Sequence, residues 1–224
     1  MERLAPLTLL GIILAGGKSS RMGRDKALLE WNGRPLLRHS YHCAAEICTQ
    51  VYVITPRLST YAPLLPDACI LIPERGENQG PLRAFQAAID FIAPDPSTWM
   101  LLLACDLPQL RAVVLREWFQ RIALATRDRE SLATGEPLPL AYVPRNPEGW
   151  WEPLCGFYQA RCRSSLDRFL QQGGRSFQHW LNQETVGALP LKDPEMLLNL
   201  NSLEGISPSH LNVQPEHIQP GPSQ

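Results

Sequence analysis

The apolar run from Leu9 to Leu14, which leads into a pair of glycines and a basic polar loop, constrains the fold more than any other stretch of the chain. A short continuous apolar run of this kind is typical of a strand buried on both faces of a parallel sheet. Gly16 and Gly17 follow it, and glycines let backbone N–H groups approach an anion closely. The sequence therefore predicts an α/β fold whose first strand ends at a phosphate-binding loop.

The loop after the glycines is strongly basic, although the chain as a whole is not. Its charged residues are Lys18, Arg21, Arg24 and Lys26, with Asp25 as the one acid. The whole chain has 21 Lys and Arg against 22 Asp and Glu, which argues against a surface for nucleic acid or for membrane lipid. The alternative is a solvated loop with incidental charges, but the strand, the glycines and the charges coincide.

Strand-like and helix-like apolar patterns alternate along the chain. Further strands are predicted at 50–55, 68–72, 99–105, 138–143 and 153–158, and helices at 36–47, 81–92, 113–125, 162–172 and 177–181. This order predicts a Rossmann-like three-layer sandwich with a mostly parallel sheet and helices on both faces. Ligands bind such sheets beyond the carboxyl ends of the strands, where the glycine loop and Asp106 both fall.

The composition suggests one domain and a polar tail. We expect residues 1–206 to form the domain and residues 207–224, rich in Pro, Ser, His, Gln and Asn, to be disordered. The six cysteines include no Cys-x-x-Cys pair, and no histidine lies at zinc-finger spacing from them. Reduced, mostly buried thiols in a cytoplasmic protein are the expectation.

Residues 14–29 resemble the N-terminal signature of the molybdenum cofactor guanylyltransferases, the MobA-like nucleotidyltransferases. That signature is roughly Leu-Ala-Gly-Gly-x-Ser-x-Arg-Met-Gly-x-Asp-Lys followed by an apolar pair, and the chain matches it almost throughout. A second match is Cys105-Asp106-Leu107-Pro108. The resemblance implies a glycosyltransferase-A-like nucleotidyltransferase fold. It also implies transfer of GMP from GTP to the phosphate of molybdenum–molybdopterin, which yields molybdopterin guanine dinucleotide and pyrophosphate.

Three charged residues are candidates for the chemistry. Lys26 would neutralise charge that grows on the phosphoryl oxygens, and Arg21 would add a bidentate phosphate contact. Asp106 directly follows a predicted strand, where it would hold Mg²⁺, and the resemblance makes it the magnesium ligand. The alternatives are that Asp106 caps a helix starting at Pro108 and that Lys26 is a solvated surface lysine.

The resemblance also implies a wider set of nucleotide contacts. Gly80 belongs to Gly80-Pro81-Leu82-Arg83-Ala84, in which Arg83 and Ala84 replace the family's usual Ala and Gly. Arg83 either holds the backbone further from the nucleotide or adds a phosphate contact. Glu74 stands where the family commonly has Asp, although it could equally be a surface acid. The nucleotide-binding residues predicted in this way are Leu14, Ala15, Gly16, Gly17, Lys26, Glu74, Gly80 and Asp106.

Two later segments are candidates for binding the acceptor. Asn199 and Asn201 lie in a match to the family's Asn-x-Asn-Thr-Pro motif and could donate amide hydrogen bonds to the acceptor, or they could simply form turns. Trp150 and Trp151 are adjacent in a polar loop and could stack on a pterin ring. Otherwise one tryptophan belongs to the core and the other covers a hinge.

Three other functions are alternatives to this one. A related transferase uses CTP on the same acceptor, but its branch tends to have Leu-Ala-Ala-Gly and Asp-Met-Pro, so Gly16 and Cys105-Asp106-Leu107-Pro108 favour GTP. Sugar-phosphate or isoprenoid-precursor nucleotidyltransferases share the fold. A catalytically silent nucleotide-binding protein is the third, and the presence of both Lys26 and Asp106 argues against it. The family further implies a transient complex with proteins of cofactor biosynthesis or insertion.

Overall fold

The computed structural model describes residues 7–16, 25–74, 80–132, 138–199 and 211–212. The strands are β1 (Leu9–Leu14), β2 (Glu30–Trp31), β3 (Arg34–Pro35), β4 (Gln50–Thr55), β5 (Ile70–Pro73), β6 (Trp99–Ala104), β7 (Ala141–Pro144), β8 (Cys155–Gln159), β9 (Val186–Leu189) and β10 (Leu211–Asn212). Seven of them form one sheet in the order β5-β4-β1-β6-β8-β7-β9, and β10-β2-β3 form a small second sheet. In the large sheet, β8 alone runs against the other strands. The predicted mostly parallel sheet is confirmed.

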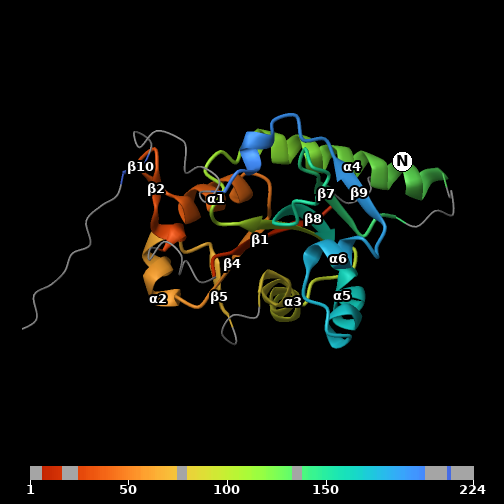
Figure 1. Cartoon of the computed structure of the whole chain (residues 1–224), viewed down its shortest axis with the longest axis horizontal. Helices are drawn as coiled ribbons and strands as arrows, with labels where there is room; N and C mark the ends of the chain where they lie inside the picture. The colour runs from red at the N-terminus through yellow and green to blue at the C-terminus, as the bar shows by residue number, and fades with distance from the viewer. Residues whose placement is uncertain (1–6, 17–24, 75–79, 133–137, 200–210, 213–224) are drawn as a thin grey trace, which may run out of the picture.

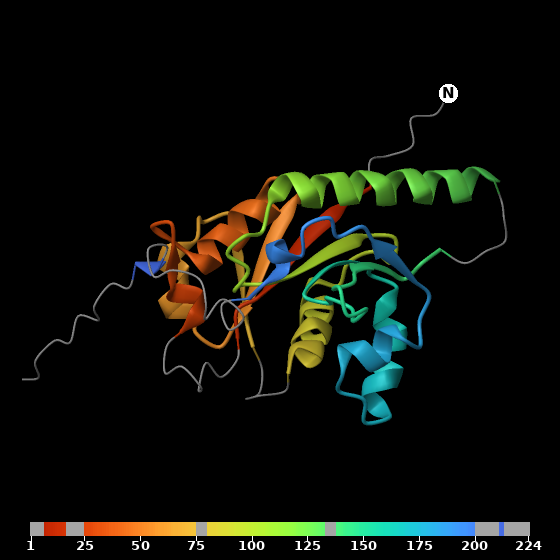
Figure 2. The same cartoon turned by 45° about the horizontal axis from the view of Figure 1, so that its top comes forward.

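Helices cover both faces of the large sheet and complete the three layers (Figures 1 and 2). The α-helices are α1 (Leu36–Ala45), α2 (Leu58–Tyr61), α3 (Pro81–Ile92), α4 (Ala112–Leu132), α5 (Cys162–Gln171) and α6 (Phe177–Leu181), and the 3₁₀ helices are η1 (Lys26–Leu28), η2 (Ala62–Leu64) and η3 (Pro194–Leu197). The long helix α4 and helix α1 pack on one face, and α3, α5 and α6 pack on the other (Figure 2).

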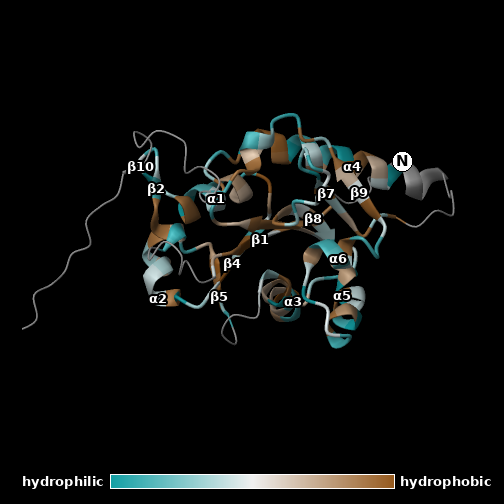
Figure 3. Ribbon diagram, in the orientation of Figure 1, coloured by the Kyte–Doolittle hydropathy of each residue, from teal (hydrophilic) through white to brown (hydrophobic). Residues whose placement is uncertain are grey.

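The central strand β1 shows how the sequence builds two cores. Because side chains alternate along a strand, Leu9 and Ile13 join the core under α1 and α4, whereas Ile12 and Leu14 join the core under α3 and α5. All four side chains are buried. Figure 3 shows the resulting hydrophobic band through the middle of the molecule. A strand that is buried on both faces must be apolar throughout, which is the pattern in the sequence.

Most of the predicted helices and strands agree with the structure. β1, β4 and α3 have the predicted bounds, and Ser176 caps α6 by accepting a hydrogen bond from the backbone N–H of His179. The prediction misses β9 and the hairpin β2–β3. The hairpin turns at Asn32 and Gly33, whose φ angles are 51° and 72°. Asn-Gly with two positive φ angles is the signature of a type I′ hairpin turn, so this element was readable from the sequence.

The expected tail needs one correction. Within residues 207–224 the structure describes Leu211–Asn212, which form β10 and pair antiparallel with Trp31 and Glu30 of β2. The expectation of a structureless tail is therefore wrong at these two residues, because backbone pairing does not require apolar side chains. All six cysteines are free thiols. Among the described residues, no helix combines the length and the apolar character needed to cross a bilayer.

Candidate active site at the carboxyl edge of the sheet

The order in which successive strands are added to the sheet reverses between β1 and β6. From β1 the chain adds β4 and then β5 on one side, and it then returns to add β6 on the other side. Leu14 and Ala104 are paired at the ends of β1 and β6, so the segments that follow these two strands begin side by side. Such a switch point is the usual place for a ligand in an open α/β sheet.

Lys26 and Asp106 meet at this switch point, although 80 residues separate them in the sequence. The Nζ atom of Lys26 lies 3.2 Å from Oδ2 of Asp106, and the two side chains are 19% and 18% exposed. The interpretation of Asp106 as the cap of a helix starting at Pro108 is wrong, because the next helix begins only at Ala112. Lys26 is likewise not a freely solvated lysine. The structure thus brings together the two residues that the sequence singles out for charge neutralisation and metal binding.

Asp106 is suited to hold a metal together with a nucleotide rather than alone. Within the described part of the chain, no three His, Cys, Asp or Glu side chains are grouped closely enough to hold an ion. Mg²⁺ in nucleotide-dependent enzymes is usually bound by one or two carboxylates, and phosphates and waters supply the other oxygens. A single, partly exposed carboxylate just beyond the end of β6 fits that pattern of ligands.

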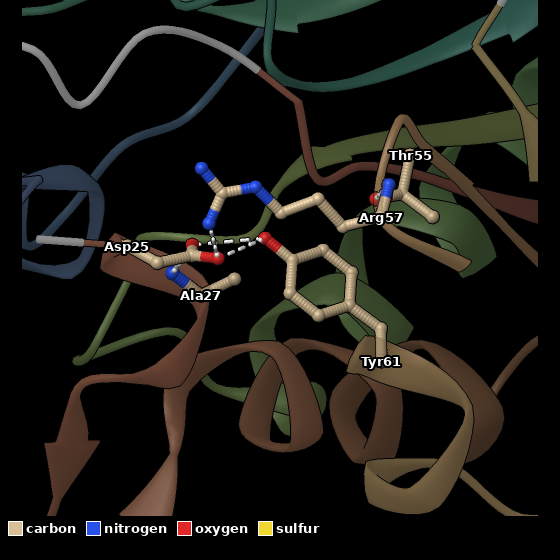
Figure 4. A network of polar contacts seen from close by, with 5 residues as sticks. All are labelled: Asp25, Ala27, Thr55, Arg57 and Tyr61. Atoms are coloured by element: carbon tan, nitrogen blue, oxygen red, sulfur yellow. Dashed lines mark hydrogen bonds and ion pairs between the residues drawn. The ribbon is translucent and has the colours of Figure 1, made fainter. Parts of the chain in front are cut away.

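Asp25, the residue before Lys26, is held by a network of polar contacts (Figure 4). The Tyr61 hydroxyl lies 2.8 and 2.7 Å from the two carboxylate oxygens, and Nη1 of Arg57 donates to Oδ2 at 2.8 Å. The Asp25 side chain also accepts a hydrogen bond from the backbone N–H of Ala27 at 3.1 Å, which caps η1. Burial, and then the hydrogen bond to Asp25, raise the pKa of Tyr61 far above its ordinary value. The Tyr61 hydroxyl is therefore a permanent donor.

Thr55, at the end of β4, connects this network to the next strand. Its Oγ1 accepts a hydrogen bond from the backbone N–H of Arg57 at 3.0 Å (Figure 4). Its carbonyl oxygen accepts another from the backbone N–H of Glu74, also at 3.0 Å. Thr55 is fully buried. One residue of the scaffold therefore fixes both the segment that holds Asp25 and the segment that carries Glu74.

The carboxylate of Glu74 lies directly over Gly16. A Cβ atom at Gly16 would collide with Oε2 of Glu74, so a larger residue there would push this flexible carboxylate aside. Ala15 is held in place because its N–H donates to the carbonyl of Ile54 at 2.9 Å. Burial raises the pKa of Glu74. Glu74 therefore lies beside Gly16, just beyond the end of β1, and is partly buried.

Gly80 begins α3 on the same side of the sheet. Its φ angle of 79° favours glycine, and its carbonyl accepts the hydrogen bond from Ala84 that starts the helix. Arg83 is exposed and donates to the side chain of Gln86 at 3.4 Å. Ala84 is buried in the core under α3. Of the two departures from the family motif, Arg83 thus lies on the exposed face of α3 and Ala84 on its buried face.

The loop between β7 and β8 borders the other side of the site, because the carbonyl of Leu154 accepts a hydrogen bond from Ala104 at the end of β6. Trp151 is the core tryptophan: it is buried, its Nε1 donates to Asn182, and the Arg145 guanidinium lies 3.8 Å from the centre of its ring. Trp150 is 60% exposed. Of the two interpretations of this pair, stacking is therefore open to Trp150 only.

The remaining predicted residues divide between described and undescribed parts of the chain. Asn199 lies just after η3. The residue before it, Leu198, packs against Leu36 at the start of α1. Gly17, Arg21 and Asn201 lie outside the described residues. Asp25, Arg57 and Tyr61 were missed as site residues. Asp25 belongs to the family signature, but the sequence presents it only as an opposing charge, and no spacing in the sequence points to Arg57 or Tyr61.

Comparison with known proteins identifies the family. The model of the MobA-like NTP transferase domain matches residues 11–186. The chain belongs to this family. Among its relatives, a probable molybdenum cofactor guanylyltransferase of Trichormus variabilis is 43% identical over 96% of both chains. Another from Synechococcus elongatus is 40% identical over 85% of this chain and 92% of that protein.

A solved structure shows the same fold. The molybdopterin-guanine dinucleotide biosynthesis protein A of Archaeoglobus fulgidus superposes with a TM-score of 0.62, covering 86% of this chain and 92% of that one at 19% identity. The predicted family and the predicted nucleotidyltransferase fold are thereby confirmed. Lys26 and Asp106 thus lie at the switch point of the sheet, where a ligand usually binds in an open α/β fold.

Proposed function

We propose that this MobA-like NTP transferase transfers GMP from GTP to the phosphate of molybdenum–molybdopterin. The observation that carries the proposal is the meeting of Lys26 and Asp106 beside the loop that follows β1. A fixed cation and a carboxylate able to hold a metal are the two groups that nucleotidyl transfer requires. The relatives named guanylyltransferases support the choice of GMP and of the molybdenum cofactor.

The transfer is a single in-line displacement. An oxygen of the pterin's terminal phosphate attacks the α-phosphorus of GTP, and the bond from that phosphorus to the oxygen bridging to the β-phosphate breaks. Pyrophosphate leaves with the electron pair. Lys26 stabilises the negative charge on the phosphoryl oxygens, and the backbone of the glycine loop holds the phosphates in line. No nucleophilic side chain is needed.

Mg²⁺ is proposed as the cofactor, with Asp106 as the protein ligand. Bound there with the phosphates of GTP, the ion would screen the charge that grows on the leaving pyrophosphate. A carboxylate has two oxygens, so Asp106 could hold the ion while Lys26, which lies 3.2 Å from Oδ2, remains beside it. Lys26 would contribute its charge to the phosphates from that position.

Glu74 is proposed to read the guanine base. Guanine presents two adjacent donors, N1–H and the N2 amino group, which match the two oxygens of a carboxylate. Cytosine presents one amino donor beside an acceptor, so one oxygen of Glu74 would face a lone pair. A site built to hydrogen-bond a substrate group discriminates strongly against an analogue that lacks the group. The close approach of Glu74 to Gly16 places this carboxylate at the edge of the glycine loop.

The test is a nucleotide series combined with a measurement of turnover. Calorimetric titration of the wild-type protein should rank GTP above ITP, which lacks the N2 amino group, and ITP above CTP. Glu74→Gln should lose most of the difference between GTP and ITP, whereas Glu46→Gln, which breaks an exposed ion pair with Arg116, should retain it. Equal affinities in the wild-type protein would refute the role of Glu74. Absence of pyrophosphate release from GTP, Mg²⁺ and molybdenum–molybdopterin would refute the transfer.

A further inference from the structure

Lys26 is presented to the reaction by a side-chain network that neither the sequence motif nor the proposed chemistry accounts for. We infer that Asp25, Arg57 and Tyr61 are positioning residues, and that they aim the Lys26 ammonium at Asp106 and at the incoming phosphates. The inference rests on the proposed function for its catalytic consequence. Its structural content, which is the direction of Lys26, can be tested without turnover.

The first step of the argument is that the network fixes the backbone on both sides of Lys26. Asp25 caps the 3₁₀ turn through the N–H of Ala27, and the carbonyl of Asp25 accepts a hydrogen bond from Leu28 at 3.1 Å. The carbonyl of Lys26 accepts a further bond from Leu29 at 3.2 Å. With its backbone fixed in this way, the long lysine side chain starts from one defined direction.

The second step concerns charge. Asp25 is adjacent to Lys26 in the sequence and would compete with Asp106 for its ammonium group if its own carboxylate were unpaired. Arg57 and Tyr61 occupy both oxygens of Asp25, whose side chain is only 12% exposed. Lys26 pairs with Asp106 instead. The network therefore segregates the charges into two pairs, Asp25 with Arg57 and Asp106 with Lys26.

The third step is that the donors come from a segment anchored to the sheet and not from the loop that they hold. Arg57 precedes α2 and Tyr61 ends it, and the Thr55 hydroxyl holds the N–H of Arg57 at the end of β4. A loop that must contact phosphates is thus tied to a fully buried strand end. Preorganisation of a charged group lowers the reorganisation needed in the transition state, and a displacement of about 1 Å can cost roughly 10²-fold in rate.

Tyr61→Phe is the most conservative variant, since it removes one hydroxyl from a buried ring. We expect kcat to fall about tenfold, with the KM for GTP and the melting temperature nearly unchanged. Arg57→Met should act in the same direction. The matched controls are Tyr52→Phe on the same strand as Thr55 and Arg116→Met, which breaks the exposed pair with Glu46, and neither should alter kcat.

A double-mutant cycle separates positioning from a general loss of structure. If Tyr61 acts through Lys26, its removal should cost nothing further in a Lys26→Ala background. Glu74→Gln serves as the additive comparison, since it should cost the same factor in both backgrounds. Additive losses for Tyr61→Phe and Lys26→Ala would overturn the inference.

The direction of Lys26 can be measured without substrate. Limited labelling with acetic anhydride, quantified by mass spectrometry of the Lys26 peptide, should be faster in Tyr61→Phe and Arg57→Met than in the two control variants, because the ion pair to Asp106 is no longer held. Unchanged labelling would overturn the inference. Faster labelling in a protein that transfers no nucleotide would support the network and refute the proposed function, so the two failures are distinguishable.

Discussion

The two sides of the site are built differently. The donor side comprises the ends of β1, β4 and β5 with η1, and its polar contacts join residues far apart in the sequence: Asp25 with Arg57 and Tyr61, 32 and 36 residues away, and Lys26 with Asp106, 80 residues away. The loop between β7 and β8 and Asn199 lie on the other side, where we propose that the acceptor binds, and we call this the acceptor side. Within that loop, Asn146 contacts Trp150 and Arg145 contacts Gly149, and each pair is four residues apart.

Long-range contacts fix a side chain only when the whole fold is formed, whereas local contacts shape a loop by itself. The donor side contains the charged groups, and its long-range contacts would hold them in place for a triphosphate. On the acceptor side, local contacts shape the turn that carries the exposed Trp150, whereas the adjacent Trp151 is anchored to Gln178 and Asn182. We expect substitutions on the donor side to change the rate and those on the acceptor side to change the affinity for the acceptor.

Asp106→Asn should have the largest effect on the reaction. Asparagine keeps the size and the hydrogen bonding of the residue but removes its charge, and the loss of one preorganised electrostatic group typically lowers kcat by roughly 10²–10³-fold. The residual rate should require far more Mg²⁺, whereas Lys26→Ala should lose rate with a nearly normal Mg²⁺ midpoint. Asp90→Asn, which breaks a surface ion pair with Arg163, is the control. Identical Mg²⁺ dependence in both site variants would contradict the separate roles of Lys26 and Asp106.

The two adjacent tryptophans should separate stability from acceptor binding. Trp151→Ala removes a buried ring and should lower the free energy of unfolding by about 3–5 kcal/mol, as measured by urea denaturation. Trp150→Ala should leave stability unchanged and raise the KM for molybdenum–molybdopterin about tenfold, the size of one lost stacking contact. If the KM for the acceptor is unaffected by Trp150→Ala, the exposed ring is not part of the acceptor side.

As the pH falls, binding of GTP should weaken at a higher pH than it would if Glu74 had the ordinary pKa of a glutamate. Glu74 must be ionised to accept both guanine donors, and burial raises its pKa, so protonation on the way to mildly acidic pH removes the contact. Calorimetry across that range should show the loss for wild type. The titration of the phosphates contributes equally in Glu74→Gln, so the difference between the two proteins isolates the carboxylate. A constant difference would contradict the assignment of Glu74 to the base.

Truncation after residue 206 should have the smallest effect. It removes β10, whose two residues pair with strand β2 of the β2–β3 hairpin. A few backbone hydrogen bonds contribute on the order of 1 kcal/mol in total, so we expect a slight fall in melting temperature and an unchanged kcat. A large loss of turnover would show that this pairing supports the donor side through η1, which directly precedes the hairpin.

The sequence predicts the fold well where burial decides it and poorly where contacts across the chain decide it. β1, β4 and α3 follow from apolar periodicity and glycine or proline boundaries. The position of Asp106 follows from the parallel topology, because it lies just beyond the end of β6. Lys26 comes twelve residues after the end of β1, so its meeting with Asp106 depends on the path of the chain between them. The environment of Asp25 does not follow, since Arg57 and Tyr61 reach it only after β4 has paired with β1 and the intervening chain has folded back.

Thr55 has a consequence for the evolution of specificity. Its hydroxyl holds the segment that orients Lys26, and its carbonyl holds the segment that carries Glu74. On the proposed function, base choice and reaction rate share one anchor, and a substitution that changes one segment should also shift the other. A lineage that moves from one nucleotide to another would need paired changes at both segments, so variation on the two sides of Thr55 should be epistatic.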